Sequence, residues 1–509
     1  MKQEVFDRLK NFQLNFVSDK VKLRLIQILN ELEHHPLCST QRLTTVTKNT
    51  ARTIITDINY LRDYLDKSAH ITSSKQGYTL NIHNSEEYID KKSSILEDEP
   101  LFIILERIFF NELLSIYEWA DYFHVSESTM IKYLKSITNE VKAFNITLDL
   151  YPVNLFGSEA DIRYFYFAFY YESDITPHTV FPSIAVQESV LQISDQLAAT
   201  EETASSFGYF SYLLYLSIER ILCGLEVTIN PELKALVLSD PEYVTILPAV
   251  KTIEETFQLR VPEDEIVFMY ESILCRRTVD FPQREEYFCL RYNKWGEIKT
   301  LAHAFRESLT DHSLNKQQDL VLLESFFTSI KLRCLLSENS NKNIQDTNDY
   351  AKAIFAHAYQ KNRAFLHTNQ QFGALFHDTL LEDICARLTL YSETIKEQYW
   401  HTSLNIAFAI EGNEYINQYI TSWVKKYLGK FQTIHFLGPS DLCESFINDN
   451  QIDLLVTNYH EYLSLPFLDL EYFLIKTVPD STDWARLLQR INPNILHSFT
   501  RIDTSSLIS

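Results

Sequence analysis

The sequence is poor in glycine, and this scarcity narrows the possible folds and sites. Only 9 glycines occur in 509 residues, about a quarter of the number expected at the usual ~7%. Neither G-x-G-x-x-G nor G-x-x-x-x-G-K-[ST] is present, which excludes the glycine-rich phosphate loops. Because few tight turns are available to a β-rich chain, we expect a mainly α protein.

Cysteine motifs and long hydrophobic runs are also missing. The 7 cysteines show no C-x-x-C spacing and no histidine at ligand intervals, which argues against zinc sites and disulfides. No secretory signal is visible at the N-terminus, and the aromatic run YFYFAFYY at residues 164–171 is far too short to span a bilayer. We expect a cytoplasmic protein without membrane segment, metal or cofactor.

Residues 116–137, IYEWADYFHVSESTMIKYLKSI, have the apolar spacing of a helix-turn-helix. Ala120 is expected at the helix crossing, and Ser126 is expected to cap the second helix. The side chains left on the outward face of that helix are Ser128, Thr129, Lys132 and Lys135. A recognition helix presents such side chains to bases and phosphates. From this window alone, an ordinary helical hairpin is an equal alternative.

A second window, STQRLTTVTKNTARTIITDINYL at residues 39–61, also reads as a helix-turn-helix. Thr50 is the expected N-cap of its second helix, with Arg52, Thr53 and Thr56 on the outer face. Its first half is weaker, because Thr44 and Thr47 stand where alanine and an apolar residue are usual. Strand-like stretches follow both windows, HITSS with GYTLNI and ITLDLYPVNLFG, and each predicts a wing.

Charge is unevenly distributed along the chain. The formal net charge is -22, but residues 1–92 contain 14 Lys+Arg against 11 Asp+Glu. An acidic protein is repelled by the phosphate backbone unless its cations gather on one face. We therefore expect low intrinsic affinity for DNA and a steep salt dependence.

The remainder divides into helical blocks and a short α/β region. Amphipathic helices are predicted in two blocks between residues 175 and 400, at 211–227 and 263–277 and then at 318–336 and 372–388. A single large helical domain is the alternative. In the last hundred residues, short apolar runs alternate with helical stretches, which predicts a small parallel-sheet domain.

ADYFHVSESTMIKYLKSI, followed by NLFGSEADIRYFYFAFYY, resembles the second helix-turn-helix and the adjoining segment of the Mga/AtxA family of virulence gene regulators. The order of the predicted helical and α/β blocks also resembles that of the family over almost the full length of the chain. The resemblance implies tandem winged helix-turn-helix units, two helical phosphotransferase-system (PTS) regulation domains (PRDs) and a C-terminal α/β domain like enzyme IIB. The corresponding segments are residues 1–92, 93–172, 173–288, 289–400 and 401–509.

By the same resemblance, the protein is expected to be a DNA-binding transcriptional activator of virulence, surface or metabolic genes in a Gram-positive bacterium, and not an enzyme. The implied partners are double-stranded promoter DNA, a second copy bound through the C-terminal domain, and PTS phosphocarrier proteins. A component of the phosphotransferase relay and an RNA-binding antiterminator with the same regulation domains are the alternatives.

The histidines depart from the family pattern. Regulation domains of this type place a phosphorylatable histidine seven residues before an arginine, and here those positions are Leu213 and Phe326. In the second block, His303 and His377 are the first candidates for phosphorylation, since apolar residues flank each on a predicted helix. The loop EGNEYIN, which corresponds to the phosphate-carrying loop of enzyme IIB, contains neither cysteine nor histidine. Cys443 is expected on a later helix, in the core.

Overall fold

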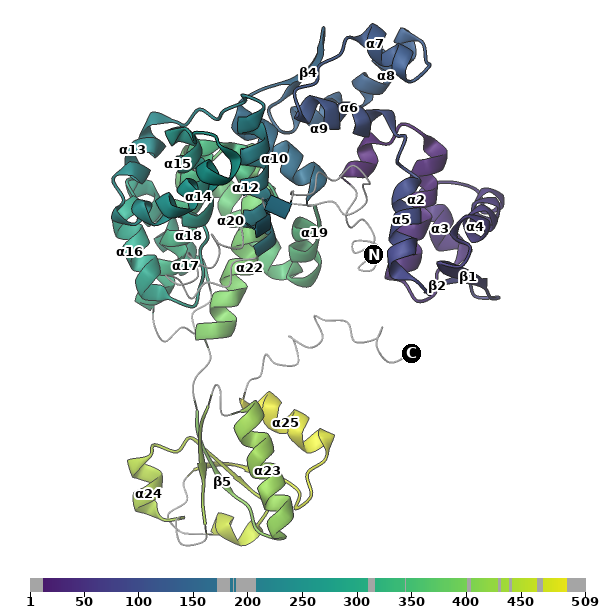
Figure 1. Ribbon diagram of the computed structural model, residues 1–509. Coiled ribbons are helices and arrows are strands. Elements are labelled where there is room, and N and C mark those ends of the chain that lie inside the picture. Colours follow the sequence, from purple (N-terminus) through teal and green to yellow (C-terminus); the bar gives the residue numbers. More distant parts are fainter. Residues whose placement is uncertain are drawn as a thin grey trace.

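The computed structural model describes residues 12–171, 184–185, 187–188, 207–309, 316–343, 345–400, 404–428, 432–438, 442–464 and 470–491. These residues are mainly helical, with two hairpins and one four-stranded sheet (Figure 1). The prediction of a mainly α chain ending in a small α/β domain is confirmed.

The first unit is a three-helix bundle with a two-stranded wing. Its elements are α2 (Lys20–His34), α3 (Thr40–Thr47), α4 (Ala51–Leu65), β1 (Ala69–Ser73) and β2 (Tyr78–Ile82), followed by α5 (Ser85–Ser94). The two strands pair antiparallel, as predicted. Thr47 is buried on α3, and its hydroxyl donates to the Leu43 carbonyl at 2.7 Å. The polar residue that weakened the sequence pattern is therefore satisfied within its own helix.

The second unit repeats this plan. Its elements are α6 (Pro100–Phe109), α7 (Ile116–Tyr122), α8 (Glu127–Ser136), α9 (Thr138–Lys142), β3 (Thr147–Leu150) and β4 (Val153–Phe156). Trp119, Ala120 and Met130 are buried where α7 and α8 meet, as the spacing predicts. The following helix α10 (Glu159–Tyr170) is buried on nearly all sides. The short 3₁₀ helix η1 (Gln13–Phe16) packs against it, with the rings of Phe16 and Phe169 centred 5.0 Å apart.

A helical body follows. Its first block contains α12 (Phe207–Leu222), α13 (Pro231–Leu238), η2 (Pro241–Ile246), α14 (Leu247–Phe257), α15 (Glu263–Leu274) and α16 (Pro282–Tyr292). The second contains α17 (Gly296–Ser308), α18 (Lys316–Leu336), η3 (Glu338–Asn341), α19 (Gln345–Ile354), α20 (Ala356–Thr368), α21 (Gln370–Leu375), η4 (Asp378–Leu380) and α22 (Leu381–Tyr399). One hydrophobic core runs through both N-terminal units and the first block, while the second block has its own.

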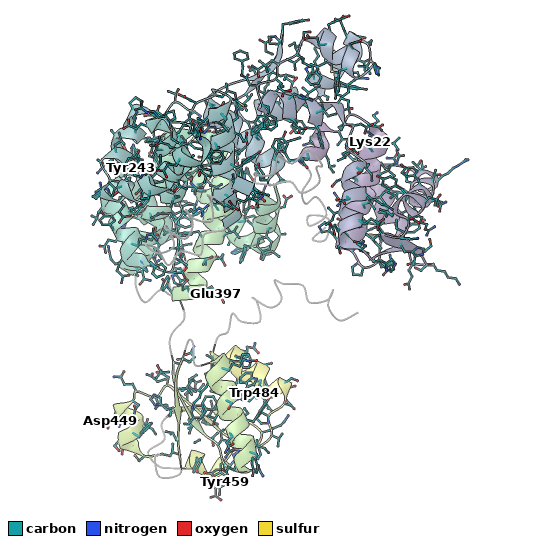
Figure 2. The ribbon with its side chains drawn as sticks, viewed as in Figure 1. Lys22, Tyr243, Glu397, Asp449, Tyr459 and Trp484 are labelled. Atoms are coloured by element: carbon teal, nitrogen blue, oxygen red, sulfur yellow. The ribbon has the colours of Figure 1, made fainter. Side chains whose placement is uncertain are left out.

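The C-terminal domain is a parallel sheet flanked by helices. Its elements are β5 (Asn405–Ala409), α23 (Glu414–Tyr427), β6 (Thr433–Phe436), α24 (Glu444–Asp449), β7 (Leu454–Thr457), η5 (His460–Ser464), β8 (Glu471–Leu474) and α25 (Ser481–Ile491). The strand order is β6-β5-β7-β8, and each neighbouring pair is parallel. Trp484 on α25, labelled in Figure 2, stacks on Trp423 of α23 with ring centroids 4.0 Å apart.

A buried ion network joins the second unit to the body. Arg163 on α10 is fully buried and donates to both carboxylate oxygens of Glu265 on α15, at 2.6 and 2.8 Å. Arg220 on α12 donates to both oxygens of Glu159 on α10, at 2.7 and 2.8 Å, and to the carbonyl of Phe109 at the end of α6. The network thus ties three helices and the second unit together.

The predicted boundary at residues 288–289 is wrong, because it falls inside α16. Helix α16 begins at Pro282, a residue that suits the first position of a helix because its missing N–H has no intrahelical acceptor there. The helix ends at the Asn293–Trp295 turn. Residues 172, 173 and 401, at two other predicted boundaries, lie outside the described residues.

We predict that Glu265→Ala lowers the free energy of unfolding by about 3–5 kcal/mol, because it leaves the buried Arg163 without its bidentate partner. Urea denaturation followed by circular dichroism measures this loss. The control is Glu263→Ala, which removes a largely exposed carboxylate paired with Lys234 and should cost roughly 0–1 kcal/mol. Equal losses in the two variants would contradict the importance of the buried pair.

Candidate nucleic-acid interface

The second helix of each helix-turn-helix is held by a side-chain cap. Ser126 Oγ accepts from the backbone N–H of Thr129 at 3.2 Å and lies 2.8 Å from the hydroxyls of both Ser128 and Thr129. Thr50 Oγ1 accepts from the N–H of Thr53 at 3.3 Å. Both predicted N-caps are confirmed, and they fix where α8 and α4 begin.

The outward face of α8 carries exposed polar side chains. Ser128, Lys132 and Lys135 are exposed, whereas Thr129 is half-buried beside the cap. Within the described part of the chain, neither lysine forms an ion pair. Their charges are therefore available to an external anion such as a phosphate group.

The outward face of α4 has a similar character. Arg52 and Thr56 are exposed, and Thr53 is half-buried because its hydroxyl lies 3.0 Å from that of Thr50. Thr56 Oγ1 donates to the Arg52 carbonyl at 3.1 Å. Arg52 has no ion-pair partner among the residues that the structure describes. The predicted side chains thus lie on two separate helices, one in each unit, and Figure 1 shows α4 on the far side of its unit from the helical body.

Two half-buried arginines fix the direction in which α4 points. Arg24 on α2 donates to both oxygens of Asp57, a buried residue on α4, at 3.0 Å for one of them. Arg62 Nε donates to the Ile71 carbonyl of β1 at 2.7 Å, which joins α4 to the wing. Such ties on both sides of a helix hold its outer face in a defined orientation.

Ile55, which is 49% exposed on α4, was not among the side chains predicted from the sequence. It follows Arg52 by three positions and precedes Asn59 by four, so it shares their side of the helix. The sequence does contain a sign of this residue's exposure: Ile55 is an apolar residue that does not fit the helical spacing of the buried Ile54, Ile58 and Leu61. An exposed branched side chain at this place suits apolar contact with a thymine methyl group in a major groove.

The two candidate histidines differ in their surroundings. His303 is exposed on α17, a helix as predicted. The prediction that His377 lies on a helix is wrong, since it stands between α21 and η4 with φ -74° and ψ 146°. Phe372, Phe376 and Leu380 are buried at intervals of four residues, which imitates a helical stripe although the chain is extended at Phe376. His377 Nδ1 lies 3.3 Å from a Glu338 carboxylate oxygen.

The loop after β5 is built from acidic and amide groups. Glu411 accepts from the Tyr462 hydroxyl, and its backbone N–H donates to Asn458 Oδ1 at 2.8 Å. The expectation that Cys443 lies on a helix in the core is wrong: it is the half-buried residue that precedes α24, with backbone angles of an extended chain. Its Sγ lies 3.2 Å from Ser445 Oγ.

The described residues contain no group of three or more His, Cys, Asp or Glu side chains arranged to hold a metal ion. None of their helices is both long and apolar enough to cross a bilayer.

Comparison with known families gives two matches along this chain. Residues 90–170 match the Mga helix-turn-helix domain, and residues 187–274 match the PRD domain. The first match contains α7 and α8, and the second contains most of the first block of the body.

Several curated proteins are similar to the chain. The capsule synthesis positive regulator AcpB of Bacillus anthracis is 19% identical over 461 residues, covering 86% of this chain and 91% of that protein. The anthrax toxin expression trans-acting positive regulator of the same organism is 20% identical over 479 residues, covering 92% and 98%. A putative trans-acting regulator of Streptococcus pneumoniae is 36% identical over 72 residues, covering 14% and 15%.

We predict that Arg52→Ala and Lys132→Ala each weaken binding to duplex DNA without changing the melting temperature, because both side chains are exposed and unpaired in the described structure. For Lys132→Ala, the slope of log K against log salt concentration should fall by roughly 1. Fluorescence anisotropy at several salt concentrations measures both effects.

Lys251→Ala is the matched control, since Lys251 is 74% exposed on α14 of the body. It should leave affinity and slope unchanged. A drop in melting temperature for Arg52→Ala or Lys132→Ala, or an unchanged affinity, would remove these residues from the interface.

Proposed function

Because the chain belongs to the Mga/AtxA family of PRD-containing transcriptional regulators, we propose that it binds double-stranded promoter DNA through α4 and α8 and activates transcription. The observation that carries the proposal is the pair of capped helices whose exposed cations have no partner within the described chain. Activation is supported by the names of the relatives, two of which are positive regulators. From their capping positions and their places on the outer faces of α4 and α8, the contact residues proposed are Thr50, Arg52, Thr53, Thr56, Ser126, Ser128, Thr129, Lys132 and Lys135.

The charge distribution supports weak binding by each unit and stronger binding by both together. Each interface offers few cations, and the chain as a whole carries a net charge of -22. Every phosphate contact adds to the salt dependence of the affinity. Two interfaces on one chain raise the total affinity through their high effective concentration, provided that both reach the same duplex.

The two alternatives lack structural support. An antiterminator of this type needs a small β-rich RNA-binding module at its N-terminus, whereas residues 20–65 contain three helices. A relay enzyme needs a nucleophile in the loop after β5, where EGNEYIN has neither cysteine nor histidine. We therefore propose a regulator that is not an enzyme and that acts in the cytoplasm.

The five-part division of the chain remains a proposal, with its fourth segment moved to begin after α16. We also propose that PTS phosphocarrier proteins act on the second block, with His303 and His377 as phosphorylation positions. Both imidazoles are exposed, His377 by 77%. In the first block, the position seven residues before Arg220 is occupied by the buried Leu213, which cannot accept a phosphoryl group.

The C-terminal domain is proposed to join two copies of the chain. Tyr415 and Tyr419 lie one turn apart on α23 and are 78% and 67% exposed. Tyr427, at the end of the same helix, is 52% exposed. Aromatic side chains are enriched at protein interfaces, and a row of them on one helix suits a symmetric contact with the same helix of a second copy.

We predict that the double substitution of Tyr415→Ser and Tyr419→Ser converts the dimer to a monomer, because it removes the apolar area of the contact. Sedimentation velocity on the full chain measures the change. Ile89→Ser is the control, as Ile89 is 59% exposed on α5, far along the chain from this domain. A dimer that persists in the tyrosine variant would locate the contact elsewhere.

The decisive test of the proposed function is competition between nucleic acids. We expect a footprint on fragments of the chain's own genome at a stated salt concentration, with unlabelled duplex DNA competing at least tenfold better than hairpin RNA of equal length. Preferential competition by the RNA would favour the antiterminator, and the absence of any footprint would overturn the proposal.

A further inference from the structure

A cavity of about 550 Å³ lies between η2, α15 and α16 in the first block of the body. Its volume falls in the range of small-molecule binding sites. Five aromatic rings contribute to its lining, those of Tyr270, Tyr287, Tyr292, Phe281 and Phe288. The cavity is remote from α4 and α8, and nothing in the proposed contact with DNA uses it. A lining of this kind suits a ligand with a flat apolar body.

The carboxylate in the cavity wall already has its partners. Asp240 is buried and accepts from the hydroxyl of Tyr270 at 3.0 Å and from the hydroxyl of Tyr292. Arg291 Nε lies 3.1 Å from its other oxygen. Asp240 therefore orders the two tyrosine rings, and its charge is balanced by a guanidinium.

Arg277 supplies a donor that has no acceptor. Its side chain is only 6% exposed, and its guanidinium carbon Cζ lies over the ring of Phe288, 3.7 Å from the ring centroid. Nη1 donates to Glu285 at 3.2 Å and Nη2 donates to the Leu274 carbonyl, while the buried Nε has no partner. A buried donor without an acceptor is costly. Nε is enclosed by protein atoms, so an anionic ligand oxygen relieves that cost by drawing the guanidinium toward the cavity. The half-buried Arg284 adds a second guanidinium to the lining.

We propose that this cavity binds a small organic anion with a flat apolar body. The anionic group accepts from Arg277, and the apolar body lies among the aromatic rings. The formal charges of the lining cancel, since Asp240 and Glu242 oppose Arg277 and Arg284. The choice of an anion rests on their partners, because Asp240 is already paired whereas Arg277 Nε is not.

Hydrogen bonds connect the cavity to the second DNA-binding unit. Glu285, the partner of Arg277, also accepts from Ser325 on α18. Helix α18 leads directly into η3, where Asn339 Nδ2 donates to Asp161 at 2.6 Å and to the Phe144 carbonyl at 2.5 Å. A ligand that draws Arg277 away from Glu285 changes the restraint on α18 and therefore on the unit that carries α8. This regulatory role rests on the proposed function; the binding site itself does not.

Isothermal titration calorimetry of the full chain tests the site, with phenyl phosphate as probe and inorganic phosphate and phenol as its two halves. We expect one phenyl phosphate per chain and at least tenfold weaker binding of either half. Arg277→Lys keeps a positive charge beside Glu285 but loses the Nε donor. It should therefore weaken the binding of phenyl phosphate at least tenfold. Tyr287→Ala, at a rim residue that is 46% exposed, removes one ring with little risk to folding and should also weaken binding.

The control is Arg260→Lys, an exposed arginine outside the cavity lining, which should bind as the unmodified chain does. No saturable binding of phenyl phosphate, or binding unaffected by both Arg277→Lys and Tyr287→Ala, overturns the inference. Measuring DNA affinity with and without saturating phenyl phosphate tests the coupling, which should disappear in Asn339→Ala. A chain that binds phenyl phosphate through Arg277 but binds no DNA would retain the site and refute only the proposed function.

Discussion

The structure depends on a set of buried charges at the junction between its DNA-binding part and its regulatory part. Arg163 and Arg220 each satisfy a carboxylate with two hydrogen bonds, and Glu159 is shared between them. A buried charge is tolerated only when its partners are present, so these helices cannot separate without exposing or orphaning an ion. The second helix-turn-helix is therefore fixed to the first block of the body. The common hydrophobic core of the two has the same effect.

This attachment is reinforced from the second block. Asp161, two residues after Glu159 on α10, accepts hydrogen bonds from Ser337 and Asn339 of the η3 segment. Helix α10 is thus held from both regulatory blocks at once. A change in the packing of either block reaches the DNA-binding unit through one helix, which is consistent with a protein whose binding and regulation are physically joined.

Much of this organisation was predictable from the sequence, because it follows from local rules. The N-caps at Thr50 and Ser126, both wings and the parallel sheet were found from capping residues, alternation and turn residues. The Arg163–Glu265 pair was not, since these residues are 102 positions apart and nothing local relates them. Periodicity also misled at His377, because buried aromatic residues four positions apart fit an extended segment as well as a helix. Ile55 was passed over because one exposed apolar residue has no periodic signature.

The replacement of the expected phosphoacceptor by Leu213 bears on how long a signal can last. A phosphorylated imidazole outlasts the contact with the protein that phosphorylated it, so it stores information after the stimulus has gone. A leucine that is 2% exposed stores nothing. Under the proposed function, an effector of the first block that depended on this position would act only while bound, and its influence would end when it dissociated. A signal read there would follow present conditions rather than past ones.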